Sequence, residues 1–148
     1  MLRFIKAGDI FCFQHTEATF VFGRISGRSS IGHIVEIFNL AKEEPTITER
    51  ELNIATRALA PFIIDSYSLF DRKTEGEWRI IGRIKGFEPQ DIDNIFFVYG
   101  VEGLKRKIDF NDNDIAISDE EAEGVPRYSP RGHEQVIKAL AANLWRAN

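Results

Sequence analysis

Short apolar segments separated by polar residues dominate the first part of the chain. The segments 10–15, 19–25 and 33–38 are rich in β-branched and aromatic side chains and are bounded by Gly, Ser or polar residues. Segments of this kind are typical of β-strands, and the few residues between them favour antiparallel hairpins. The pattern therefore predicts an antiparallel meander of three strands at the start of the fold.

A helix is predicted after these strands. Thr48 stands three residues before Glu51, which is the spacing of a capping box at a helix N-terminus. Four later positions share one face of such a helix: Leu52, Ala55, Thr56 and Leu59. Pro61 ends the helix because proline has no amide hydrogen to donate, and a further apolar run follows at 62–70.

The middle of the chain predicts more strands. Residues 78–84 alternate, with Trp78 and Ile80 on one face and arginines on the other, as in a half-buried strand. Residues 95–99 are continuously apolar, which favours a central strand. A hairpin is predicted next, with strands at 104–110 and 114–118 and a turn at 111–113 between them.

The end of the chain predicts a surface loop and a helix. Residues 119–132 are acidic and then contain Pro and Gly, which is typical of an exposed loop. Ser129 and Pro130 fit an N-cap followed by proline at the first helical position. From Glu134 onwards, apolar side chains repeat at helical spacing and predict a helix packed on the sheet. They are Val136, Ile137, Leu140 and Leu144, with Trp145 beside them.

Strands lead and helices interrupt them without regular alternation, which predicts a single α+β domain over residues 1–148 with a mainly antiparallel sheet. We expect this sheet to be strongly curved or barrel-like, with one central helix and a C-terminal helix. The expected core positions are Phe11, Phe13, Phe22, Trp78, Ile80, Phe96, Phe97, Leu140 and Leu144.

The composition agrees with a globular domain that needs no covalent or metal staple. Of 148 residues, 43% are hydrophobic and 28% are charged, as in ordinary soluble domains. The one cysteine, Cys12, lies in an apolar run, which predicts a buried side chain and excludes an internal disulfide. No stretch approaches the ~20 apolar residues of a membrane helix, and the start has no apolar run typical of a secretion signal. We therefore expect a cytoplasmic protein.

Negative charge is concentrated in one segment. The net charge is −4, yet residues 109–123 contain seven carboxylates and neither Lys nor Arg. A localised acidic segment suits a basic partner, because complementary charge attracts it over a distance. The candidate partner-binding residues are Asp109, Asp112, Asp114, Asp119, Glu120, Glu121 and Glu123.

No set of residues has the spacing of a metal or phosphate site. The histidines at positions 15, 33 and 133 are not paired with one another or with cysteine at ligand spacing. Residues 27–32 are rich in Gly and Ser, but they precede a strand and lack the lysine of a phosphate loop. Residues 109–120 begin like a calcium loop, but Asp114 stands where that loop needs glycine. We therefore expect no metal, no cofactor and no enzymatic activity.

One basic cluster keeps a nucleic-acid alternative open. In the run Lys105, Arg106, Lys107, the two lysines would share one face of a strand and the arginine would point away. Such a cluster is typical of a solvated edge strand, and no aromatic residues alternate with it as in single-strand binders. A small barrel that binds nucleic acid through Lys105 and Lys107 is one alternative. A toxin-like hydrolase, which would need a cleft of converging titratable residues, is another.

Three short motifs follow one another along the chain, in an aromatic hairpin and then a middle strand. They are Gly8-Asp9-Ile10-Phe11, Phe22-Gly23-Arg24-Ile25 and Trp78-Arg79-Ile80-Ile81-Gly82. With the late helix, their order resembles the immunity protein 26 family of bacterial polymorphic toxin systems, over most of residues 6–145.

The resemblance implies a cytoplasmic antidote that binds the toxic domain of a secreted or contact-delivered effector and blocks it. Many such toxins are nucleases with basic active sites, and the acidic residues 109–123 would suit such a partner by competing with phosphate. The free protein is expected to be a monomer. The family defines no contact surface that can be carried over, so the acidic residues remain a prediction from charge alone.

Overall fold

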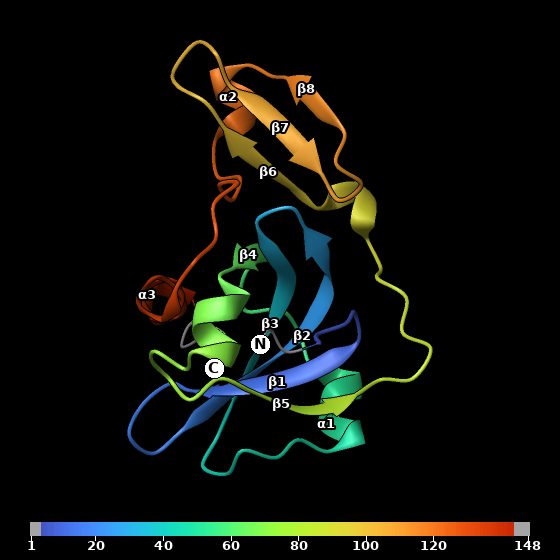
Figure 1. Ribbon diagram of the computed structural model, residues 1–148, viewed down its shortest axis with the longest axis vertical. Coiled ribbons are helices and arrows are strands. Elements are labelled where there is room, and N and C mark those ends of the chain that lie inside the picture. The colour runs from blue at the N-terminus through green and yellow to red at the C-terminus, as the bar shows by residue number, and fades with distance from the viewer. Residues whose placement is uncertain (1–3, 144–148) are drawn as a thin grey trace.

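The computed structural model describes residues 4–143, and Figure 1 shows two sheets stacked along the long axis with short helices around them. The first sheet has the order β4-β3-β2-β1-β5 and the second has the order β6-β7-β8. The strands of the first sheet are β1 (Asp9–Gln14), β2 (Phe20–Ser29), β3 (Gly32–Lys42), β4 (Phe62–Ile64) and β5 (Arg79–Arg83). Those of the second are β6 (Phe96–Tyr99), β7 (Arg106–Asp109) and β8 (Asp114–Ala116). The helical elements are α1 (Glu49–Ile54), a π-helical turn η1 (Tyr67–Asp71), a 3₁₀ turn η2 (Ile92–Asn94), α2 (Asp119–Ala122) and α3 (His133–Asn143).

The predicted α+β class and the antiparallel strand pairing are confirmed, but the predicted barrel is wrong. Every pairing between the named strands is antiparallel. Neither sheet is closed or strongly curled, because β4 and β5 end the first sheet on opposite sides (Figure 1). Side chains from η1 and α3 pack into the core of the first sheet. The sheet therefore buries its apolar side chains without closing on itself.

The helix predicted from residue 48 begins as expected and ends early. Thr48 and Glu51 form the capping box that their spacing predicts. The main chain then becomes extended and follows β3, with Asn39 N–H donating to Thr56 C=O at 2.7 Å and Ala58 N–H donating to Ile37 C=O at 2.8 Å. β4 covers only part of the edge of β3, and the exposed main chain beyond it needs partners. This long-range pairing takes precedence over the local helical pattern.

The apolar strand predicted to be central lies at the side of the second sheet. On one side β6 pairs with β7. On its other side, Val98 N–H donates to Pro126 C=O, and Val98 C=O accepts from Tyr128 N–H. The predicted hairpin of β7 and β8 is confirmed, with its turn at 111–113. Its two strands are adjacent in sequence, so their register follows from local turn geometry.

The predicted loop at 119–132 contains a helix, and the last helix starts later than expected. Ser118 and Glu121 form a second capping box that begins α2. Pro130 does not start α3, because Arg131 is held in extended form against β4. Arg131 N–H donates to Ile63 C=O at 2.9 Å, and its C=O accepts from Asp65 N–H at 2.9 Å.

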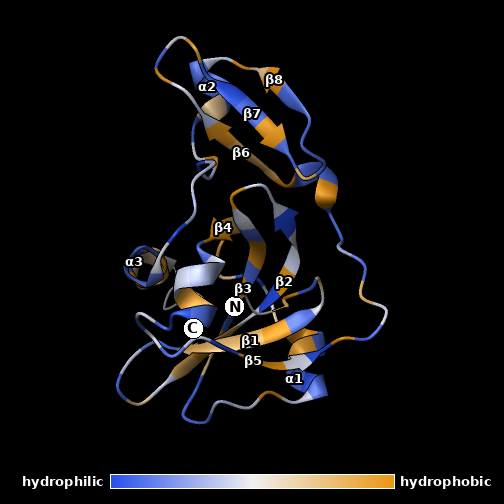
Figure 2. Ribbon diagram, in the orientation of Figure 1, coloured by the Kyte–Doolittle hydropathy of each residue, from blue (hydrophilic) through white to orange (hydrophobic). Residues whose placement is uncertain are grey.

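An aromatic stack on one face of the first sheet forms the centre of the core. The Trp78 ring lies parallel to Phe13 with 4.1 Å between the ring centroids, while Phe11 stacks at 5.4 Å and Phe70 contacts it edge-on at 5.8 Å. Trp78 is fully buried, and its Nε1–H donates to His133 Nδ1 at 3.0 Å. This cluster joins β1, η1, β5 and α3 into one packed unit. Figure 2 shows hydrophobic residues concentrated in the strands.

Most of the expected core positions are buried, in three separate clusters. Leu140 joins the aromatic stack, and Ile80 packs against it half-buried. Phe22 lies with Cys12 on the opposite face of the first sheet. Phe97 belongs to the junction between the two sheets. Phe96 is only partly buried, with the Lys107 amine over its ring, so the expectation for it holds in part. Leu144 lies outside the described residues.

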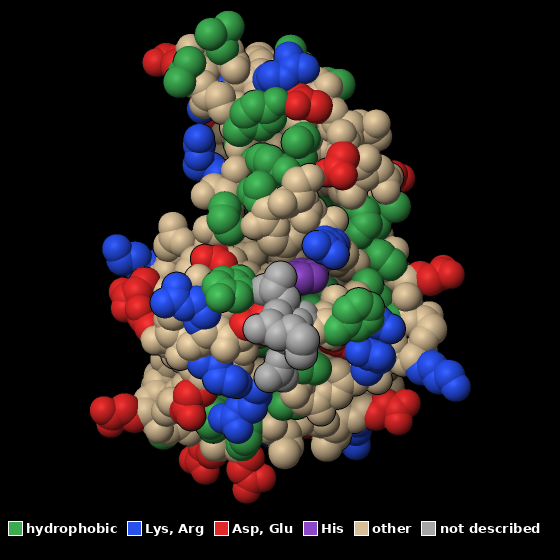
Figure 3. Space-filling view, viewed as in Figure 1, with side chains coloured by type: hydrophobic (Ala, Val, Ile, Leu, Met, Phe, Trp, Pro, Cys, Tyr) green, Lys and Arg blue, Asp and Glu red, His purple; other side chains and the backbone are tan. Residues whose placement is uncertain are grey.

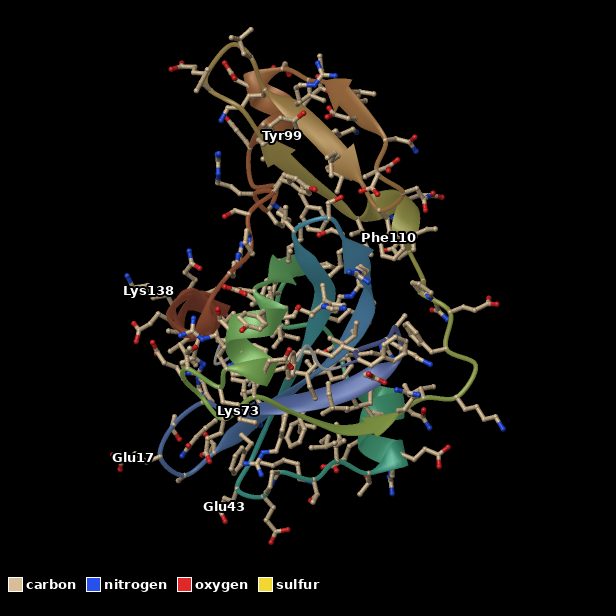
Figure 4. The ribbon with its side chains drawn as sticks, in the orientation of Figure 1. Glu17, Glu43, Lys73, Tyr99, Phe110 and Lys138 are labelled. Carbon is tan, nitrogen blue, oxygen red and sulfur yellow. The ribbon has the colours of Figure 1, made fainter. Side chains whose placement is uncertain are left out.

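The two sheets meet through apolar side chains. The buried residues of this junction are Ile34, Ile63, Ile95 and Phe97. Phe110, labelled in Figure 4, packs against them and covers Gly27, where a Cβ would stand 2.5 Å from the Phe110 ring. A glycine is therefore required at position 27 for the second sheet to approach the first this closely.

We predict that Trp78→Ala lowers the free energy of unfolding by about 3–5 kcal/mol, because it opens a cavity between three aromatic rings. Trp78→Phe keeps part of the stack and loses the hydrogen bond to His133, so its effect should be smaller. Urea unfolding followed by circular dichroism measures both variants. A free energy of unfolding for Trp78→Ala equal to that of the wild type would contradict this description of the core.

We also predict that the protein becomes less stable as the pH falls from about 7.5 to 5.5. Burial lowers the pKa of His15, His33 and His133 below the ordinary 6.5, and at His133 it outweighs the opposing carboxylates of Glu75 and Glu134. Near and below pH 6.5 the histidines of the unfolded chain bind protons more readily than those of the folded protein. Their contribution to the free energy of unfolding is therefore full well above pH 6.5 and is lost as the pH falls below it. His133→Gln should reduce this dependence, and an unfolding free energy that is constant over the range would contradict it.

Candidate partner-binding surface

The second sheet and α2 form a protruding lobe with most of the unbalanced charge. Residues 95–128, which we call the acidic lobe, contain eight carboxylates and four Lys or Arg residues, so they carry a charge equal to the −4 of the whole chain. Figure 1 shows this lobe at one end of the long axis, away from α1 and β5. The remaining residues are balanced in charge, and the lobe gives the protein a negative end.

Asp109 builds the turn of the β7–β8 hairpin. Its Oδ1 accepts from the main-chain N–H groups of Asn111 and Asn113, each at 2.8 Å, and its Oδ2 accepts from the Asn113 side chain at 2.9 Å. These hydrogen bonds from Asn113, together with one from Asn111 and the charge of Lys107, lower the pKa of Asp109. The carboxylate is therefore ionised and turned toward its own loop.

Asp114 is neutralised by a neighbour on the next strand. Its carboxylate accepts a hydrogen bond from the Tyr99 hydroxyl and from Arg106 Nε, the latter at 2.8 Å. The hydrogen bond from Tyr99 is the largest single cause that lowers the pKa of Asp114, and the hydrogen bond and charge of Arg106 lower it further. The three side chains form a cross-strand bridge over β6, β7 and β8, so Asp114 adds little net charge to the surface.

Asp119 joins α2 to the β6–β7 hairpin, and Glu121 caps the start of α2. Both Asp119 oxygens accept from the Gly103 N–H at 3.0 Å, and the Glu121 carboxylate accepts from the Ser118 N–H at 3.1 Å. Hydrogen bonds from Ser118 lower the pKa of Glu121. Both carboxylates therefore accept main-chain hydrogen bonds within the lobe, and Asp119 links α2 to the hairpin tip.

The other predicted residues face solvent. Within the described part of the chain, Asp112, Glu120 and Glu123 are exposed and form neither a side-chain hydrogen bond nor an ion pair. A shallow depression of about 350 Å³ lies beside them, lined by Glu102, Lys105, Asp119, Ala122 and Glu123. Glu102 was missed from sequence because it precedes the acidic segment, and the hairpin brings it beside α2.

Apolar side chains project from the tip of the acidic lobe. Val101 is 67% exposed and Leu104 is 74% exposed, and Leu104 N–H donates to Val101 C=O at 2.9 Å across a turn. Gly100 and Gly103 have φ of 100° and 83°, which favour glycine and allow the turn to be tight. Figure 3 shows hydrophobic side chains and a carboxylate together at this tip. The two side chains give the tip a small exposed apolar surface beside charge.

The basic cluster does not form a groove. Lys107 places its amine 4.5 Å from the centre of the Phe96 ring, and Arg106 pairs with Asp114. Lys105 lines the depression in which Glu102, Asp119 and Glu123 supply three carboxylates. Negative charge therefore surrounds the lysine that a nucleic-acid interface would need.

The histidines contribute to packing and hydrogen bonding. His33 Nδ1 lies 2.6 Å from Ser66 Oγ, and His133 accepts from the buried Trp78. Over residues 4–143, no group of three or more His, Cys, Asp or Glu side chains is arranged to hold a metal ion. Over the same residues, no helix is long and apolar enough to cross a membrane.

Comparison with known families agrees with the resemblance seen in the sequence motifs. The model of the family described as immunity protein 26 matches residues 6–109, from the turn before β1 to the end of β7. The match covers more than half of the chain, and the chain belongs to this family of immunity proteins. Curated proteins and solved structures give no match. The match ends at Asp109, so β8, α2, α3 and most of the acidic segment follow it.

Proposed function

We propose that this protein binds a cognate toxin domain directly in the cytoplasm, as a monomer, and that the acidic lobe is the surface that attracts the toxin. Membership of the immunity protein 26 family supports a toxin as the partner. The observation that carries the proposal is the negative end of the molecule, with Asp112, Glu120 and Glu123 unpaired among the described residues. A basic toxin domain, such as a nuclease that binds phosphate, fits this charge.

The acidic lobe has two features with different roles in binding. The unpaired carboxylates act over a distance and raise the rate of association, because immunity requires that the toxin be captured before it reaches its target. Val101 and Leu104 act at contact, because burying exposed apolar side chains stabilises the complex once it forms. Asp119 keeps these two side chains in place by holding Gly103.

The nucleic-acid alternative has less support. It depended on a small barrel, and neither sheet is closed. It also depended on a basic groove, whereas Lys105 lies beside three carboxylates that would repel phosphate. We therefore favour a protein partner over RNA or DNA.

We predict that the triple variant D112N/E120Q/E123Q associates with its toxin about tenfold more slowly at low salt, because complementary charge accelerates association. Stopped-flow binding to the toxin domain encoded beside this protein measures the rate. The matched control is E43Q/E44Q, which removes two exposed carboxylates beyond β3, at the opposite end of the molecule from the lobe (Figure 4). The control should bind at the wild-type rate, and all three proteins should unfold at the same temperature.

Salt separates charge from shape in the same experiment. The wild-type association rate should fall steeply between about 50 and 500 mM salt, because the Debye length shortens, and the triple variant should respond less. An association rate that is indifferent both to salt and to the triple substitution would show that the acidic lobe does not attract the toxin. The interface should then be sought on the strand face around Arg79 and Arg83.

We also predict that the protein has no turnover of its own. Its titratable side chains serve turns, caps and ion pairs, as Asp109, Asp114 and Asp119 show. The purified protein should leave RNA, DNA and simple esters intact with and without Mg²⁺. Hydrolysis that co-purifies with the wild type and disappears in a point variant such as Ser66→Ala or His33→Asn would contradict this prediction.

A further inference from the structure

A cleft near the junction of the two sheets has the opposite charge to the acidic lobe. Its volume is about 720 Å³, and its charged lining residues are Arg57, Arg127 and Arg131, with no carboxylate. The rest of the lining is small or apolar and comes from residues 58–60, residues 124–126 and Ala139. The lining thus contains three arginines and no carboxylate, although the net charge of the protein is −4. We call this site the arginine cleft.

The main chain fixes two of these arginines. Arg127 lies between Pro126 and Tyr128, which exchange hydrogen bonds with Val98 of β6 at 2.9 and 2.8 Å. Arg131 pairs with β4 through its own N–H and C=O. Both arginine side chains therefore extend from main chain that hydrogen bonds hold in place.

The cleft contains more positive charge than the protein neutralises. Arg57 donates to the buried Glu36 at 2.9 Å and is already paired. Within the described residues, Arg127 and Arg131 form neither an ion pair nor a side-chain hydrogen bond. The Arg131 guanidinium stacks 4.6 Å from the centre of the Phe62 ring, and burial lowers the pKa of Arg131. A half-buried cation without a counter-ion is unfavourable, because proteins normally pair buried charges.

We propose that the arginine cleft binds an anionic group, a carboxylate or a phosphate, carried on a small apolar body. The guanidinium groups of Arg127 and Arg131 present the planar donors that recognise such oxyanions. The apolar side chains of Leu59, Val125 and Pro126 offer contacts to the body of the ligand. The site is open to solvent, so the anionic group would be held at the arginines while part of the ligand body stays exposed. Glu123 and the acidic lobe beside it repel a polyanion that extends beyond the cleft.

The anionic group has two sources, which experiment can distinguish. It belongs either to a free small molecule or to a carboxylate side chain of the toxin. The second source rests on the proposed function, whereas the first does not. The probes are therefore adenosine monophosphate, which carries a phosphate, N-acetylphenylalanine, which carries a carboxylate, and the toxin domain itself.

The test compares wild type with R127Q/R131Q and with the control R50Q, which removes an exposed arginine of α1. Calorimetric titration at low salt should show that wild type and R50Q bind at least one small probe with a Kd of about 1 mM or lower. R127Q/R131Q should bind it at least about tenfold more weakly, and R131K should be weakened in between, because lysine keeps the charge but loses the planar fork. The bound probe should also raise the unfolding temperature of the wild type and leave that of R127Q/R131Q unchanged.

The toxin arm decides the source. If neither small probe binds but R127Q/R131Q dissociates from the toxin at least about tenfold faster than R50Q does, the anion is a toxin carboxylate and the cleft is confirmed as its site. If neither probe binds and R127Q/R131Q behaves like the wild type toward the toxin, the proposal is overturned. An oligonucleotide that binds the cleft more tightly than adenosine monophosphate would also overturn it. If the wild type binds a probe but not the toxin, the proposal for the arginine cleft stands and the proposed function is contradicted.

Discussion

The double attachment of the segment between Pro126 and Arg131 determines how the two sheets are placed. Near its start the segment pairs with Val98 at the open side of β6, and at its end it pairs with Ile63 and Asp65 beside β4. Main-chain groups need hydrogen-bond partners when they are buried, so both attachments are strongly favoured. The apolar junction around Phe97 adds to them. The lobe is thereby fixed to the body, and the arginines of the segment are fixed at the cleft.

The same constraint separates charges of opposite sign. Carboxylates gather on the lobe, where several hold turns and caps, while Arg127 and Arg131 follow the segment toward the body. Within the described residues, neither arginine forms an ion pair with a carboxylate of the lobe, so the two groups do not neutralise each other directly. A partner with a basic surface and a neighbouring anionic group would satisfy both, and the two proposals are compatible with one toxin interface.

Local features of the structure could be predicted from the sequence, and long-range pairings could not. The capping box at Thr48 and the β7–β8 hairpin depend on residues a few positions apart. The early end of α1, the outer position of β6 and the late start at His133 depend on strands distant in sequence. Hydrophobicity predicted full burial for Phe96, but the residue is only partly buried, because Lys107 of the neighbouring strand rather than an apolar layer covers its ring.

The sequence by itself determined where the carboxylates are and how many there are, because charge is a property of the residue. Only the tertiary structure decided which of them are engaged within the protein. Asp109, Asp114, Asp119 and Glu121 accept hydrogen bonds from main-chain amides or neighbouring side chains. The arginine cleft carries no sequence signal at all. Its members come from segments as far apart as residues 57 and 131, and only the pairing of main-chain segments across the two sheets brings them to one site.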